Sequence, residues 1–265
     1  GDCVPTLAPG DHTLTLDHEG RSRRALVHVP TDLVSSPPLV LNFHGWLFDP
    51  EDQRSRSRMN PHADTHGYVV AYPAGIDNSW SGGACCGTAV SEGIDDVGFV
   101  RKLAARLQDE LCVDPQRIYA TGFSNGGFLA HRLACEASDL IAAAAPVSSL
   151  MTLDPATCDR DHVAPLIHLH GTTDIVVLYI GNPLFDYPPF GDSVAVWTDF
   201  HGCTEPVRQD LPRGHCDDYT TCTSGAELRF CTLERWGHEW PGGASPLPAN
   251  DAIWSFLSRF TRDAP

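Results

Sequence analysis

Residues 122–126 have the sequence GFSNG, which matches the G-x-S-x-G pattern of a nucleophile elbow. A short apolar segment at 117–120 precedes this pattern, and a helix-like segment at 127–134 follows it. The two glycines suit a very tight strand-to-helix turn, because a Cβ atom at either position would clash there. The pentapeptide alone is a weak signal, but its strand–turn–helix context predicts that Ser124 is a catalytic nucleophile.

A serine nucleophile needs a general base, and the base needs a carboxylate that orients it. Asp174 follows a predicted strand, and His238 lies in a Gly- and Pro-rich loop after another. The order Ser124, Asp174, His238 is the order found in α/β-hydrolases, so we predict these residues as the catalytic triad. Turn formation is the alternative role for Asp174, and Glu239 and Asp199 are the alternative acids.

The other histidines are less suited to act as the base. His168 and His170 lie on a predicted strand, where we expect them to point to opposite faces or to pack in the core. His131 lies on the helix after the elbow, and we expect it to point away from the site. No H-E-x-x-H sequence and no C-x-x-C pair occurs, and the histidines lack the spacing of metal ligands. We therefore expect no metal and no cofactor.

Two backbone N–H groups are predicted to form the oxyanion hole. Residues 38–46, PLVLNFHGW, form a buried-strand segment that ends in His-Gly. In α/β-hydrolases such a loop supplies one donor, and the residue after the nucleophile supplies the other. We therefore predict the main-chain N–H groups of Trp46 and Asn125 as the donors. A tight turn shaped by the side chain of His44 is the alternative reading of the His-Gly pair, and it is compatible with this role.

Length and charge narrow the class of protein. The chain has 265 residues, which is enough to bury a large core in one α/β domain, and we expect a single catalytic domain over 1–265. The formal net charge of −16 argues against nucleic acid and anionic membranes as partners. No apolar run approaches the roughly 18 residues of a membrane-spanning helix. We expect a monomer that binds a small or oligomeric substrate.

The cysteine content predicts disulfides. Ten cysteines are too many for a reduced cytosolic protein of this size, so we expect five disulfides and a secreted, extracellular protein; buried free thiols are the alternative. From proximity in the chain, we pair Cys203 with Cys231 and Cys216 with Cys222. The sequence begins at Gly1 without a basic and apolar leader, so we expect any signal peptide to have been removed already.

Strands and helices are expected to alternate along most of the chain, which predicts a mostly parallel sheet. The loop at 75–93 contains the adjacent Cys85 and Cys86, for which separate partners are favoured over a bond between the two. The Pro-, Tyr- and Phe-rich segment 176–191 is the natural substrate-facing loop. The expected strands are 13–16, 25–29, 38–43, 68–72, 117–120, 140–147, 166–169 and 228–235, and the expected helices are 51–66, 95–111, 127–134, 192–200 and 250–260, the last with Asn250 as its N-cap.

The chain resembles the secreted esterases related to polyhydroxybutyrate depolymerases and feruloyl esterases, the carbohydrate-esterase branch of the α/β-hydrolases. The resemblance extends over nearly the whole chain and implies a mostly parallel central sheet with helices on both faces, stabilised by disulfides. It also implies a triad of Ser124, Asp174 and His238. Trp46 departs from the pattern, because many relatives carry a smaller residue after His-Gly. The matching runs are LVLNFHG at 39–45, DDVGF at 95–99, YATGFSNGG at 119–127, HGTTD at 170–174 and GHEWPG at 237–242.

The resemblance leaves several substrates open, namely feruloyl or acetyl esters of the plant cell wall, polyester chains and small aryl esters. Trp46, Trp80 and Trp240 are predicted to bind substrate by stacking on a phenolic acyl group or a sugar face, with core packing as the alternative. The sequence ends soon after its last predicted helix, without a substrate-adsorbing module, which favours feruloyl or acetyl esters over polyhydroxybutyrate. A non-catalytic binding module on the same fold is a further alternative, which the intact triad disfavours.

Overall fold

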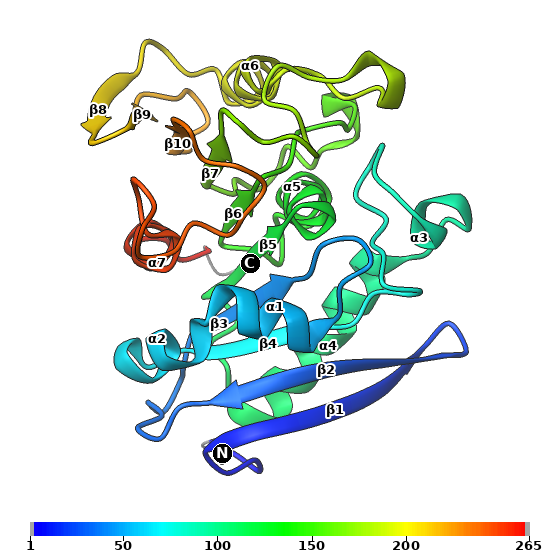
Figure 1. Cartoon of the computed structure of the whole chain (residues 1–265). Helices are drawn as coiled ribbons and strands as arrows, with labels where there is room; N and C mark the ends of the chain where they lie inside the picture. The colour runs from blue at the N-terminus through cyan, green and yellow to red at the C-terminus, as the bar shows by residue number, and fades with distance from the viewer. Residues whose placement is uncertain (1–2, 263–265) are drawn as a thin grey trace.

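The computed structural model describes residues 3–262 and places ten strands in one sheet, in the order β1-β2-β4-β3-β5-β6-β7-β10-β9-β8 (Figure 1). The six central strands pair in parallel. They are almost entirely buried and apolar because helices cover both of their faces. These strands are β4 (Val69–Pro73), β3 (Leu39–Phe43), β5 (Ile118–Phe123), β6 (Ala143–Val147), β7 (Leu166–Gly171) and β10 (Leu228–Leu233).

An antiparallel hairpin extends each edge of the parallel core. At one edge, β1 (Gly10–His18) and β2 (Arg21–Val29) form the predicted hairpin, longer than expected, and β2 pairs with β4. At the other edge, β9 (Gly214–Tyr219) and β8 (Val207–Leu211) continue the sheet from β10. This second hairpin was not predicted, because most of its residues are polar; ladder hydrogen bonds and cross-strand pairs hold it instead.

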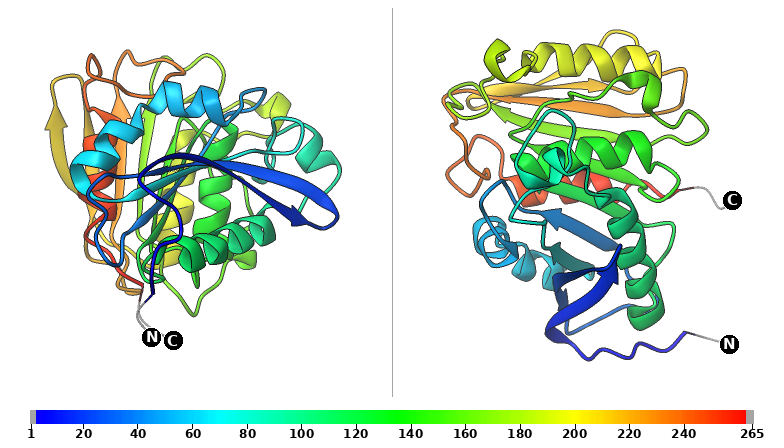
Figure 2. Two further views of the ribbon diagram at one scale, coloured as in Figure 1. Left: turned by 90° about the horizontal axis from the view of Figure 1, so that it is seen from below. Right: turned by 90° about the vertical axis from the view of Figure 1, so that its right-hand side faces the viewer.

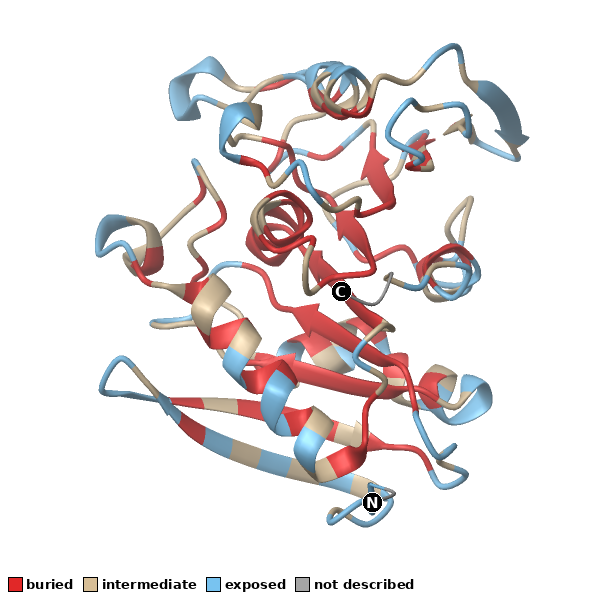
Figure 3. Cartoon of the chain, turned by 180° about the vertical axis from the view of Figure 1, so that it is seen from behind, coloured by how far each residue is buried: buried red, intermediate tan, exposed pale blue. Residues whose placement is uncertain are grey.

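Helices lie on both faces of the sheet, as predicted (Figure 2). Their buried sides and the central strands form two apolar layers, which Figure 3 shows as buried segments surrounded by exposed loops. Among residues 3–262, no helix has both the length and the apolar character needed to cross a bilayer. One layer contains α4 (Asp96–Leu111), α5 (Asn125–Glu136) and α6 (Phe190–His201), and the other contains α2 (Met59–His66) and α7 (Ala249–Leu257), beside α1 (Pro50–Ser57), while α3 (Thr88–Ser91) is a short helix in a loop.

Two helix predictions need correction. The expected helix at 51–66 is split, because Pro61 has no N–H for the carbonyl of Ser57 and its ring would clash with that group in a continuous helix. The break falls at Arg58, which adopts the left-handed conformation with φ 50°. Asn250 does not cap α7, which begins one residue earlier. Its amide instead bonds Trp240 and the Ser57 carbonyl, and thereby joins α7 to α1.

All ten cysteines are paired, so the predicted five disulfides are confirmed. The expectation of separate partners for the two adjacent cysteines is wrong, since they bond to each other within the loop before α3. Four bonds therefore link residues distant in sequence and one links neighbours. The bonds are Cys3–Cys112, Cys85–Cys86, Cys135–Cys158, Cys203–Cys222 and Cys216–Cys231.

The predicted pairs Cys203–Cys231 and Cys216–Cys222 are wrong. Cys216 and Cys231 are directly opposed on β9 and β10, with their Cα atoms 4.0 Å apart. Cys203 and Cys222 face each other in a separate antiparallel bridge, with a Cα–Cα distance of 3.8 Å. The alignment of neighbouring strands therefore determines which cysteines pair. Proximity along the chain could not predict this, because the β8–β9 hairpin itself was not predicted.

Several histidines are buried beneath α6. His168 and His170 point to the same face of β7, as residues two apart in a strand must: His168 Nε2 donates to the Ser149 carbonyl at 2.9 Å, and His170 Nδ1 lies 3.1 Å from the same oxygen. Core packing is thus confirmed for them, and the alternative of opposite faces is wrong. His131 accepts a hydrogen bond from the Trp197 indole at 3.0 Å. Burial lowers the pKa of His131 to about 3 and that of His201 to about 4, so both are neutral near pH 7.

The turn from β5 into α5 requires glycine at two positions. A Cβ atom on Gly122 would overlap the Gly126 carbonyl oxygen, and one on Gly126 would overlap the carbonyl oxygens of Phe43 and His44. The first turn of α5 therefore lies directly against the end of β3. This close approach of two backbones is why the glycines recognised in the sequence occupy both positions.

We predict that Gly126→Ala lowers the free energy of unfolding by about 1–3 kcal/mol. The added methyl group would meet the backbone of Phe43 and His44, which cannot move aside as a flexible side chain could. Urea unfolding followed by circular dichroism measures the change. Gly237→Ala is the control, since its Cβ atom would meet only the Thr173 carbonyl oxygen, at 3.9 Å. Equal stability of the two variants would contradict this account of the turn.

We predict that the protein loses stability as the pH falls from about 6.5 towards 4. The unfolded chain binds protons on its histidines below about pH 6.5, whereas the folded chain keeps His131 and His201 neutral until lower pH. Each of these two histidines therefore contributes to the free energy of unfolding in full above about pH 6.5. About 1–2 kcal/mol of each contribution is lost by pH 5. Urea midpoints at pH 7.5, 6.5 and 5 test this. His201→Gln is expected to give a shallower pH dependence, and an identical slope would refute the assignment.

Candidate active site

Ser124 lies at the junction of β5 and α5 in an unusual backbone conformation, with φ 54° and ψ −122°. A positive φ is rare for a residue other than glycine and is maintained only where the surroundings enforce it. Here the Ser124 N–H donates to the Val147 carbonyl at 2.9 Å, and its carbonyl accepts from Gly127 at 2.7 Å and Phe128 at 3.0 Å. The side chain of Ser124 is thereby held above the end of the sheet, as the sequence motif predicts.

Asp174 and His238 follow the neighbouring parallel strands β7 and β10, whose carboxyl ends meet at the same edge of the sheet. His238 Nδ1 lies 2.7 Å from Asp174 Oδ2. The other carboxylate oxygen accepts hydrogen bonds from the Val176 and Val177 main-chain N–H groups, at 2.9 and 2.8 Å. His170 supports this turn, because its Nε2 bonds the Val177 carbonyl at 2.8 Å. With Nδ1 donating to Asp174, Nε2 of His238 is free to accept a proton.

Ser124 and His238 line the same cavity, which encloses about 480 Å³. The His238 ring also packs on Phe123, the residue before Ser124, with 4.7 Å between ring centroids. The structure thus brings the three predicted triad residues to one edge of the sheet. Apart from Ser124 and His238, the cavity is lined by Trp46, Leu47, Phe48, Cys85, Cys86, Val176, Val177, Phe185 and Tyr187.

The loop after β3 lies directly beside Ser124. A Cβ atom on Gly45 would come within 3.3 Å of Ser124 Cβ. His44 shapes this loop, because its Nδ1 donates to the Gly45 carbonyl at 2.8 Å and its Nε2 accepts from the Gly75 N–H at 2.9 Å. Burial lowers the pKa of His44 to about 4, which keeps the ring in the neutral form that both bonds require.

The two predicted oxyanion donors follow the residues of the contact between Gly45 and Ser124: Trp46 follows Gly45, and Asn125 follows Ser124. Leu47 and Phe48 donate their N–H groups to main-chain carbonyls, whereas within residues 3–262 no hydrogen bond to a protein acceptor is found for the N–H of Trp46 or Asn125. The Asn125 side chain is held by the Trp80 backbone, with its Oδ1 2.7 Å from the Trp80 nitrogen and its Nδ2 3.0 Å from the oxygen. Asn125 is thereby fixed next to Ser124.

Only one of the three predicted substrate-binding tryptophans lines the cavity. Trp46 does so and is 46% exposed. The prediction is wrong for Trp80, which is fully buried and donates its indole N–H to the His44 carbonyl at 3.0 Å. It is also wrong for Trp240, which is buried and donates to Asn250 Oδ1 at 3.0 Å. Both indoles turn towards the core, and a loop sequence does not specify that direction.

Of the nine other residues that line the cavity, Trp46 was predicted individually, four lie in the predicted substrate-facing segment, and four were not predicted. Val176, Val177, Phe185 and Tyr187 fall within the segment 176–191, whose aromatic and proline content did indicate a substrate-facing loop. Leu47 and Phe48 follow the His-Gly pair and could have been found from that position. Nothing in the sequence around Cys85 and Cys86, apart from their adjacency, indicated that they line the cavity.

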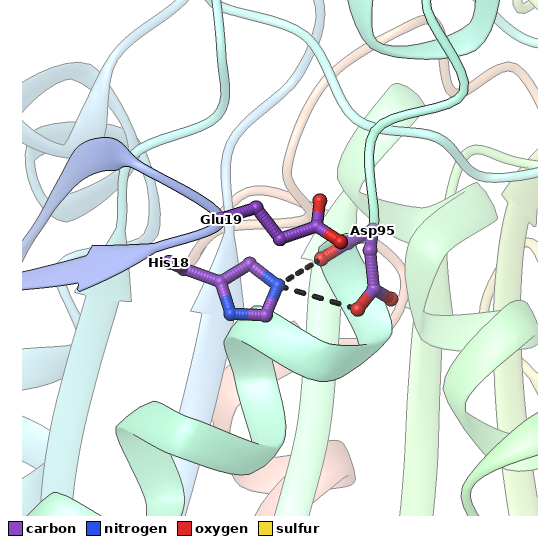
Figure 4. Close-up of side chains that lie close together, drawn as sticks. All are labelled: His18, Glu19 and Asp95. Carbon is purple, nitrogen blue, oxygen red and sulfur yellow. Dashed lines mark hydrogen bonds and ion pairs between the residues drawn. The ribbon is translucent and has the colours of Figure 1, made fainter.

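One group of side chains in residues 3–262 has the composition of a possible metal site, namely His18, Glu19 and Asp95 (Figure 4). His18 Nε2 lies 3.0 Å from the Asp95 carbonyl oxygen and 3.2 Å from its carboxylate. The same carboxylate caps α4 through the Gly98 N–H at 2.8 Å. These contacts join the β1–β2 hairpin to the start of α4, and none of the three residues lines the cavity.

Comparison with solved structures shows which fold this site is built on. No protein-family model matches the chain. Acetyl xylan esterase from Aspergillus awamori has a TM-score of 0.68 at 14% identity, over 93% of this chain and 99% of that chain. The fold is therefore the predicted α/β-hydrolase fold, with its mostly parallel central sheet and helices on both faces.

Two relatives are named as feruloyl esterases, and the second is similar enough over both chains to show the family. Feruloyl esterase B of Piromyces equi is 29% identical over 90% of this chain, which spans 45% of that longer protein. Feruloyl esterase D of Neurospora crassa is 30% identical over 273 residues, covering 97% of this chain and 88% of that protein. With a relative matched over nearly the full length of both chains, the protein belongs to the feruloyl esterase family of carboxylic ester hydrolases.

Proposed function

We propose that the chain is a secreted serine esterase that hydrolyses feruloyl or acetyl esters of the kind found in plant cell walls. The observation that carries the proposal is the pair His238 Nδ1–Asp174 Oδ2 at 2.7 Å, with His238 and Ser124 lining one cavity. The names of the related esterases support the substrate class, because they are feruloyl esterases and an acetyl xylan esterase.

In the proposed mechanism, Ser124 Oγ attacks the ester carbonyl carbon while His238 Nε2 takes its proton. The N–H groups of Trp46 and Asn125 stabilise the oxyanion of the tetrahedral intermediate. The C–O bond to the alcohol then breaks, and His238 gives its proton to the leaving alkoxide. Water attacks the acyl-enzyme with His238 again as the base, which releases the acid and restores Ser124. Asp174 stays ionised and holds the imidazole in the required tautomer.

The cavity supports an uncharged organic acyl group as the part of the substrate bound beside Ser124. Apart from His238 and Ser124, its lining side chains are aliphatic, aromatic or disulfide sulphur. Trp46, Phe48, Phe185 and Tyr187 offer aromatic faces, and an aromatic pair adds about 0.5–1.5 kcal/mol beyond the burial of its area. The aromatic ring of a feruloyl group matches these apolar and aromatic walls in polarity.

Five disulfides support the proposal of secretion, because such bonds form and persist in oxidising compartments.

We predict that Ser124→Ala abolishes turnover of p-nitrophenyl acetate and that Asp174→Asn lowers kcat on the order of 10⁴-fold, because the amide favours the wrong tautomer of His238. The asparagine keeps a carbonyl oxygen for the Val176 and Val177 N–H groups, so the fold is expected to survive. Asp210→Asn, on the exposed edge strand β8 and outside the cavity lining, is the control.

Equal turnover by wild type and Ser124→Ala would refute the serine mechanism. Activity of Asp174→Asn within about tenfold of wild type would show that another carboxylate, such as Glu239, orients the histidine.

For substrate, we expect a higher kcat/KM for methyl ferulate than for acetylated xylan and little clearing of a polyhydroxybutyrate film, with short aliphatic p-nitrophenyl esters reporting only general esterase activity because their leaving group is activated. Aromatic contacts in the cavity account for up to roughly tenfold of this preference. A parallel panel of these four substrates measures it. Rapid clearing of the film without release of ferulate would instead favour the depolymerase reading.

A further inference from the structure

We propose that the Cys85–Cys86 disulfide is a specificity element of the cavity, and that its sulphur atoms form an apolar wall against which the acyl group is bound. The inference rests on the proposed esterase function. Whichever alcohol leaves, the acyl group remains on Ser124 until water releases it. Cys85 and Cys86 line the same cavity as Ser124, so they border the space in which that group must lie.

A stabilising role does not account for this bond. Disulfides that close long loops stabilise a fold chiefly by restricting the unfolded chain, and the effect grows with loop length. The other four bonds join residues 15 to 109 positions apart, whereas this one joins neighbours and encloses no chain between them. Its effect must therefore be local, and its surroundings are the cavity and Asn125.

The loop that carries the disulfide is fixed in place. Asn125 Nδ2 donates to the Cys85 carbonyl at 3.1 Å, and the Ala84 N–H donates to Thr152 Oγ1 at 3.1 Å. Gly82 lies so close to α5 that a Cβ atom would be 2.7 Å from the Leu129 nitrogen. These contacts hold the loop before the disulfide, and the Ala89 N–H, which donates to Ser79 Oγ at 2.9 Å, holds it afterwards. The disulfide therefore has a defined position relative to Ser124.

Trp46 extends the same wall. A Cβ atom on Gly87 would lie 2.7 Å from Trp46 Nε1, so the indole packs directly over the backbone that follows Cys86. Trp46 and both cysteines line the cavity. The wall thus combines an indole with two polarisable sulphur atoms. Sulphur atoms contact aromatic rings favourably, so this wall suits an aryl acyl group better than an acetyl group.

The test compares Cys85→Ala/Cys86→Ala with a control that removes a disulfide elsewhere, Cys135→Ala/Cys158→Ala. The substrates are p-nitrophenyl ferulate and p-nitrophenyl acetate, which share a leaving group and differ only in the acyl group. Loss of the Cys85–Cys86 sulphur atoms is expected to raise KM for the ferulate ester about two- to tenfold and to change the acetate ester less than about twofold. The control is expected to leave the ratio of the two kcat/KM values unchanged while lowering the unfolding midpoint.

A binding measurement makes the test independent of turnover. In a Ser124→Ala background, the Kd of methyl ferulate is expected to rise about two- to tenfold when the Cys85–Cys86 bond is removed. If the alanine pair does not fold, Cys85→Ser/Cys86→Ser keeps nearly the same volume and serves in its place.

An unchanged Kd, or an equal loss of kcat on both esters, would overturn the proposed wall; the second result would assign the bond to the positioning of Asn125. A wild type that turns over neither ester but whose Kd depends on the disulfide would refute the proposed esterase function and leave the wall standing.

Discussion

The close contact between the first turn of α5 and the end of β3 is the constraint on which the candidate site depends. Gly126 lies against the Phe43 carbonyl, and Gly45 lies against Ser124, so no side chain fits between the two backbones. This contact sets the position of Ser124 relative to the loop after β3. Trp46 follows Gly45 and Asn125 follows Ser124, so the contact also fixes the chain at the two proposed oxyanion donors.

The residues that could be predicted from the sequence are those that lie in short, recognisable motifs. Ser124, Asp174 and His238 each sit in a local pattern of strand and turn, and a parallel sheet brings the ends of such strands to one edge. The disulfide pairing was predicted wrongly because it depends on the register of a polar hairpin, which has no apolar alternation to reveal it. Trp80 and Trp240 were misplaced because the direction of a loop side chain is decided by the core it meets.

The proposed chemistry and the proposed specificity come from different parts of the molecule. The ends of parallel strands and the start of α5 supply the polar groups that would act on the ester. Three loops, after β3, before α3 and after β7, supply the apolar walls. Loops can vary in sequence without disturbing the sheet, so the same polar groups can serve different acyl groups in different members of a family.

The positions of the five disulfides determine what remains of the candidate site when the protein unfolds. They close the segments 3–112, 85–86, 135–158, 203–222 and 216–231, and Ser124, Asp174 and His238 all lie outside these closed segments. The covalent network therefore forms separate cross-linked blocks, with Ser124 and Asp174 on the open connections between them and His238 beyond the last block. Once the sheet comes apart, nothing covalent keeps the three residues near one another, so an unfolded chain with every disulfide intact retains no active site.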